Sequence, residues 1–186
     1  MAAFALATSV TPGPVNVVAL SAGARHGWRA SLPYVFGATA GFTALLLLVG
    51  FALEQVVHAL PRFALGLRWA GGAFLLYMAW RLAGDRGGLD VATRSSRRPS
   101  MLAGAAMQWL NPKAWFATLS GMAVYGIAQV GLFAAIYFAV CFASIAAWAV
   151  AGSTLATVLA DGRTLRRLNV AMAALLAASA VVMLWA

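Results

Sequence analysis

The sequence is poor in charged residues, and this shortage excludes most classes of soluble protein. Charged side chains make up 9% of the 186 residues, whereas a soluble domain carries about 25%. Hydrophobic residues make up 63%, and the mean hydropathy is +0.88. So little charge cannot cover a globule with a hydrated surface. We therefore exclude a nucleic-acid-binding domain, a secreted domain and an ordinary cytosolic enzyme, despite the net charge of +9.

Groups that bind metals or carry out catalysis are also scarce. The single cysteine, Cys141, cannot form an internal disulfide or a dithiol pair, and we interpret it as a packing residue. A soft metal site needs cysteine or histidine ligands and a hard cation needs carboxylates, but the chain has only two histidines and four acidic residues. Serine-hydrolase and zinc-protease motifs are absent from the sequence. We expect no metal, no cofactor and no enzymatic activity.

What the chain does contain is a series of long apolar runs. A transmembrane helix needs about 20 apolar residues. Such runs cover residues 2–23, 32–53, 63–80 and 168–185, and the run from 101 to 160 has room for two spans. Tyr125, Gly126 and Gln129 mark the expected turn inside that long run. The predicted fold class is an all-α integral membrane protein with six transmembrane helices, and no segment before Arg25 reads as a cleaved signal peptide.

The basic residues predict how the spans are oriented. Ten of the thirteen lysines and arginines lie in three loops, which follow the first, third and fifth spans. These loops are residues 25–29, 81–98 and 163–167. The positive-inside rule places these three loops in the cytoplasm. Both termini are then expected on the opposite, extracytoplasmic side.

Two proline-containing segments interrupt the apolar runs. Residues 11–16 (TPGPVN) lie in the first span, and residues 111–113 (NPK) lie in the fourth. Proline removes a backbone donor and breaks or kinks a helix. Each segment also resembles a helix start, with Asn111 as a suitable N-cap and Pro112 at the first helical position. In lipid, the free N–H groups of such a start must be satisfied or must line a cavity.

The two interruptions occupy matching places in the chain. Pro14 precedes Arg68 by 54 residues, and Pro112 precedes Arg166 by 54 residues. We therefore predict one transporter domain, residues 1–186, with half-repeats at about 1–83 and 101–186 and a cytoplasmic linker at about 84–100. Three spans in each half give the halves opposite orientation. Interrupted spans at matching positions of inverted halves indicate a transport site near the middle of the bilayer.

Lys113 is the charged residue expected deepest in the bilayer. It lies 15 residues beyond Arg98, which is roughly 20 Å of helix rise. An intramembrane cation is costly and is a functional candidate by default. The alternative is that Lys113 only neutralises carbonyl groups at a helix break. Asn16 and Asn111 have the same two possible roles, and Gln108 and Trp109 are further candidates for lining the same cavity.

The two interruptions, taken together, resemble the LysE/RhtB amino-acid exporter superfamily. The first match is TPGPVNVVALSAGARHGWRASLPYVFGATAGF, residues 11–42, with a Pro-Gly-Pro segment followed by asparagine. The second is GAAMQWLNPKAWFATLSG, residues 104–121, which contains an Asn-Pro-Lys block. YMAWRLA, residues 77–83, is similar to the end of the third span in that family. The resemblance covers nearly the whole chain and keeps the order of the elements.

The resemblance implies a multi-pass exporter of amino acids or close derivatives in the bacterial inner membrane, driven by protons. Its partners are then an amino-acid substrate, the lipid bilayer and protons, with no nucleic acid. The family motif assigns substrate binding and translocation to Pro12, Gly13, Pro14, Asn16, Asn111, Pro112 and Lys113.

Two features depart from the family pattern. Val15 stands where many relatives have a further asparagine, which puts the substrate preference in doubt. Only 11 residues precede Pro12, so either the outer half of the first span is trimmed or the start codon lies upstream.

Other readings stay open on the sequence alone. The chain could export another small solute or a cation, or it could be a membrane subunit that transports nothing. Gly37 and Gly41 form a small-xxx-small pair, which we expect to pack helices within one chain rather than between two. Whether the chain forms a homodimer is left open.

Overall fold

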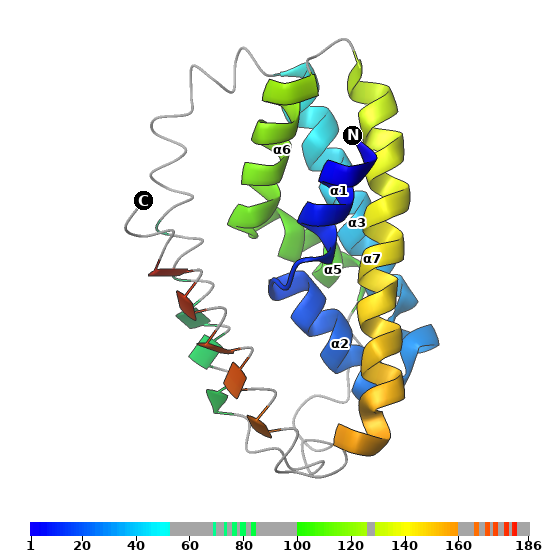
Figure 1. Cartoon of the computed structure of the whole chain (residues 1–186), viewed down its shortest axis with the longest axis vertical. Coiled ribbons are helices and arrows are strands. Elements are labelled where there is room, and N and C mark those ends of the chain that lie inside the picture. The colour runs from blue at the N-terminus through cyan, green and yellow to red at the C-terminus, as the bar shows by residue number, and fades with distance from the viewer. Residues whose placement is uncertain are drawn as a thin grey trace.

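The computed structural model describes residues 1–52, 100–125 and 129–159, together with scattered positions between 69 and 84 and between 166 and 181. The three continuous stretches fold into six helices (Figure 1). In chain order these are α1 (Ala2–Val10), α2 (Pro14–His26), α3 (Trp28–Phe51), α5 (Met101–Trp109), α6 (Pro112–Tyr125) and α7 (Val130–Leu159).

The first apolar segment is a broken helix, as the sequence predicts. α1 and α2 meet at a bend of 63°, with residues 11–13 between them. The second predicted break is also confirmed, because α5 ends at Trp109 and α6 begins at Pro112. α6 ends at Tyr125 and α7 begins at Val130; Gly126, which the sequence places in the turn between them, lies outside the described residues.

Among the described residues, two helical segments are long and apolar enough to cross a membrane. They are Trp28–Phe51 and Val130–Leu155, and the bent pair α1–α2 makes a third if it counts as one span. The structure describes only a few positions of the predicted spans 63–80 and 168–185. Arg68 and the linker residues 85–99 lie wholly outside the described residues. The all-helical class and the apolar spans are therefore confirmed, while six spans in two inverted repeats stay a prediction.

Glycines allow the helices to cross in close contact. Gly23 of α2 lies against the backbone of Ala149 in α7, and Gly152 of α7 lies against the carbonyl of Leu20 in α2. At both positions a Cβ atom would collide with the neighbouring backbone. The same holds between α3 and α5, where Gly37 packs on Met101. The small-xxx-small pair of α3 therefore packs helices within the chain, as predicted.

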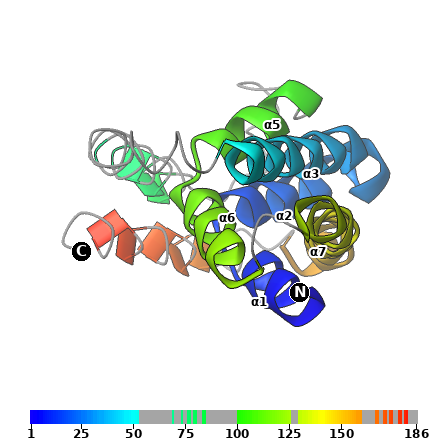
Figure 2. The same ribbon diagram turned by 90° about the horizontal axis from the view of Figure 1, so that it is seen from above.

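α7 is the longest of the described helices. It packs against α1, α2 and α3, and it runs the length of the molecule beside the broken pair α1–α2 (Figures 1 and 2). The Tyr137 ring of α7 stacks on Phe42 of α3, with ring centroids 4.2 Å apart. This packing brings one face of α7 against the break between α1 and α2.

Candidate functional site

The end of α1 is closed by side chains rather than by backbone groups. The last carbonyl groups of a helix have no partner within it, and in lipid no water replaces that partner. Asn16 donates from Nδ2 to the carbonyl oxygens of Ser9 (2.8 Å) and Thr11 (2.9 Å). Trp148 of α7 donates from Nε1 to the carbonyl of Val10 at 3.1 Å. Asn16 is 4% exposed, so both hydrogens of its amide group are used in these hydrogen bonds at the break.

The second break is built as the sequence predicts. Asn111 is the N-cap of α6, because its Oδ1 accepts from the backbone N–H of Lys113 at 3.1 Å. The Asn111 carbonyl accepts from the N–H of Ala114 at 2.9 Å. On the α5 side, Trp115 donates from Nε1 to the Trp109 carbonyl at 2.8 Å. Asn111 also has a long contact, 3.5 Å, from Nδ2 to Oε1 of Gln108.

Lys113 joins the two breaks to each other. Its Nζ donates to the carbonyl of Thr11 at 2.7 Å, so this one oxygen accepts from both Lys113 and Asn16. The aliphatic part of Lys113 passes Gly13, where an added Cβ would lie 3.5 Å from the Lys113 Cδ and Nζ atoms. None of the four acidic residues of the sequence falls within the described stretches. In this conformation the ammonium group is therefore held by a carbonyl dipole.

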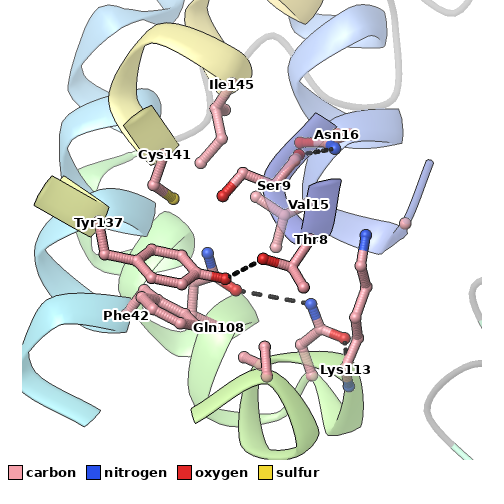
Figure 3. Close-up of a pocket in the computed structure, with 14 residues that line it drawn as sticks. Thr8, Ser9, Val15, Asn16, Phe42, Gln108, Lys113, Tyr137, Cys141 and Ile145 are labelled. Atoms are coloured by element: carbon pink, nitrogen blue, oxygen red, sulfur yellow. Dashed lines mark hydrogen bonds between the residues drawn. The ribbon is translucent and has the colours of Figure 1, made fainter. Parts of the chain in front are cut away.

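A small cavity lies between the two breaks and α7 (Figure 3). Its volume is about 30 Å³, which is room for about two water molecules and too little for an amino acid. All six described helices contribute to its wall. The lining residues are Thr8, Ser9, Gly13, Val15, Asn16, Phe42, Gln108, Asn111, Lys113, Ala114, Ala117, Tyr137, Cys141 and Ile145.

The predicted site residues divide into two groups. Gly13, Asn16, Asn111 and Lys113 line the cavity. The three prolines are not among the lining residues: Pro12 is exposed, while Pro14 and Pro112 are buried at the first positions of α2 and α6. The prolines therefore shape the backbone at the two breaks and do not line the cavity. Of the two further candidates, Gln108 lines the cavity.

Trp109 has a different role. Its indole Nε1 donates to the carbonyl of Gly41 in α3 at 3.1 Å, and the residue is not part of the cavity wall. The expectation that it lines the cavity is wrong, because its ring faces the α3–α5 contact.

Sequence reasoning missed one whole wall of the cavity. Tyr137, Cys141 and Ile145 come from α7, and Thr8 and Ser9 come from the last turn of α1. The i, i+4, i+8 spacing on α7 places its three residues on one face. Cys141 is buried in the core, as interpreted, but it is also a wall of the cavity. No group of three potential metal ligands occurs among the described residues.

Comparison with known proteins identifies the chain's relatives. A family model described as LysE type translocator matches residues 6–186. A cysteine/O-acetylserine efflux protein of Klebsiella pneumoniae is 32% identical over 130 residues, which are 70% of this chain and 61% of the relative. Proteins of the same name from Salmonella choleraesuis (37%) and Escherichia coli O1:K1 (36%) match over 83 residues, 43% of this chain.

The chain spans only part of these relatives. The matched region covers 61% of the Klebsiella protein and 41% of each of the other two. No solved structure matches the chain.

Proposed function

Since the chain belongs to the LysE type translocator family, we propose that it exports amino acids or close derivatives across the bacterial inner membrane. The relatives named above are efflux proteins for cysteine and O-acetylserine, which favours a small neutral substrate. The observation that carries the proposal is the Lys113 ammonium group, which lines a cavity between two helix breaks and has a carbonyl as its partner.

The substrate carboxylate is the natural partner for Lys113. In the proposed cycle Lys113 exchanges the Thr11 carbonyl for a carboxylate, which is a stronger acceptor because it is charged. The start of α2 lies beside it, and its N-cap, Gly13, has no side chain to cap the helix. Free N–H groups at a helix start carry partial positive charge and favour anions. The alternative roles of Lys113 are thus compatible: it holds the break when the site is empty and the substrate when the site is filled.

Transport requires that the cavity open and close. A volume of about 30 Å³ holds no amino acid, so we assign this conformation to a closed state between two open ones. The proposal is that one half of the molecule rocks against the other around the breaks, as inverted-repeat transporters do. This proposal includes six spans, basic loops in the cytoplasm and termini on the extracytoplasmic side.

Proton coupling is also part of the proposal, because export against a concentration gradient needs a source of energy. We propose that the proton gradient of the inner membrane supplies it. Export that continues at full rate after the gradient is dissipated by an uncoupler would contradict this part.

A dipeptide-feeding assay tests the proposed function. Cells that lack their own amino-acid exporters carry the chain or an empty vector, and extracellular amino acids are measured over time. We expect selective release of one or a few small amino acids by cells that express the chain. Equal release in both strains, with the protein present in the membrane, would overturn the proposal and favour another solute or a subunit without transport activity. Cation export is disfavoured because Lys113 repels cations.

A further inference from the structure

The cavity has two chemically different ends. Lys113 gives one end a cation, which is bonded to the Thr11 carbonyl at the first break. At the other end Tyr137 and Cys141 of α7 face Ser9 of α1 (Figure 3). Thr8 lies between the two ends. In the proposed function the Lys113 end binds the substrate carboxylate, and the α1–α7 end has no role yet.

The hydrogen bonds at the α1–α7 end fix which groups are free. The Thr8 hydroxyl donates to the carbonyl of Phe4 at 2.7 Å. A hydroxyl has only one hydrogen to donate, so in the contact between Thr8 and Tyr137 the tyrosine donates and Thr8 accepts. The Tyr137 oxygen therefore keeps its lone pairs as acceptors beside the cavity.

Ser9 supplies a second polar group that is not in use. Its Oγ atom is buried and makes no hydrogen bond of ordinary geometry among the described residues; the polar groups that it faces are the Tyr137 hydroxyl and the Cys141 thiol. It points toward the Cys141 thiol across the cavity (Figure 3). A buried hydroxyl without a hydrogen-bond partner costs free energy. A bound group that can donate or accept a hydrogen bond would remove the cost.

We infer that Ser9, Tyr137 and Cys141 form the subsite that selects the substrate's side chain, and that this subsite takes a short side chain ending in a hydroxyl or thiol group. The inference rests on the proposed function, since it needs an amino acid whose carboxylate lies at Lys113. The stacked rings of Tyr137 and Phe42 line the same cavity, and a long side chain would have to displace them. Because no acidic residue is among the lining residues, a cationic side chain has no counter-charge there.

The test compares two substrates that differ in one group. Cysteine and 2-aminobutyrate have the same skeleton, with a thiol in one and a methyl group in the other. Purified protein in liposomes is assayed for transport of each, and the ratio of the two rates is the readout. For the unmodified chain we expect a preference for cysteine, because a site built to bond a polar group rejects the analogue that lacks it.

Ser9→Ala and Tyr137→Phe each remove one hydroxyl from the subsite and leave Lys113 in place. We expect each to lower the cysteine preference by roughly two- to tenfold, the value of one hydrogen bond, with transport of 2-aminobutyrate retained. Thr154→Ala is the matched control: it removes an exposed hydroxyl of α7 that bonds only to the Ala151 carbonyl, and its ratio should equal that of the unmodified chain.

The outcomes separate the two claims. If the unmodified chain transports amino acids but the ratio is unchanged in both subsite variants, the subsite is wrong while the proposed function stands. If the unmodified chain transports neither these two nor any other amino acid, the proposed function and the subsite both fail. Thermal unfolding of each variant in detergent checks that it is folded. If one of the two subsite variants does not fold, the other still tests the subsite.

Discussion

Asn16 holds the end of α1 with two hydrogen bonds from one amide group. Its two acceptors are the carbonyl of Ser9, in the last turn of α1, and the carbonyl of Thr11, the C-cap of α1. Lys113 shares the second of these acceptors. The break is thus a small polar network inside an apolar bundle, and each member depends on the others for its partners.

Asn16→Asp tests this network. The substitution keeps the shape of the side chain but replaces its donor with a carboxylate oxygen that repels the two carbonyls. Leaving a buried acceptor unsatisfied costs about 1–3 kcal/mol. We expect the midpoint of thermal unfolding in detergent to fall by roughly 2–10 °C.

The control for this prediction is Thr43→Val. The Thr43 hydroxyl bonds only to the Thr39 carbonyl of its own helix, so its loss should change the midpoint little. A midpoint for Asn16→Asp as high as that of the control would show that the amide does not stabilise the break.

Helix α7 makes contact with α2 through a glycine at a fixed place. Gly152 lies directly on the Leu20 carbonyl, while Gly131, near the start of the same helix, has open space where a Cβ would lie. One helix therefore contains a glycine that packing requires and another that it does not. The contact matters for the site, because it sets how α7 presents Tyr137 and Cys141 to α1.

Gly152→Ala should push α7 away from α2. Overpacking of this kind costs about 1–3 kcal/mol, so we expect a clear fall in the thermal unfolding midpoint and lower transport. Gly131→Ala adds the same methyl group at a free position and should be neutral or slightly stabilising, since alanine favours helix by about 1 kcal/mol. Equal midpoints for the two variants would argue against close α2–α7 packing.

In the proposed transport cycle, the molecule as a whole opens to let a substrate reach the cavity. Cys141 reports on that opening, because it is the only cysteine of the chain and is 3% exposed in the closed state. We expect N-ethylmaleimide to label Cys141 slowly in resting liposomes and faster during turnover. The rate in denatured protein gives the full reactivity of the thiol. Labelling that is equally fast at rest and during turnover would contradict a closed resting state.

The sequence predicts the parts of the site that break a pattern. Prolines and asparagines stand out inside apolar runs, and a lysine there is conspicuous, so both breaks and the position of Lys113 follow from residue type and spacing. The N-cap role of Asn111 follows from the Pro112 beside it, and the structure confirms it.

The wall formed by α7 could not be predicted in the same way. α7 is apolar around its whole circumference, so its pattern does not show which face meets the break. Tyr137 and Cys141 join the site because glycine contacts with α2 and the stack on Phe42 fix the rotation of the helix. Those contacts join residues far apart in the chain. Thr8 and Ser9 look like ordinary helix hydroxyls until α7 is placed beside them.

The central claim is that Lys113 binds the carboxylate of an exported amino acid, and one transport measurement tests it directly. Purified chain in liposomes is compared with two variants. Lys113→Met keeps an unbranched side chain one atom shorter than lysine and removes its charge. Arg29→Met removes an exposed cation at the start of α3. We expect amino-acid transport by the unmodified chain and by Arg29→Met. For Lys113→Met we expect a rate at least tenfold lower, because a charged hydrogen bond is lost. Transport by folded Lys113→Met at the unmodified rate would contradict it.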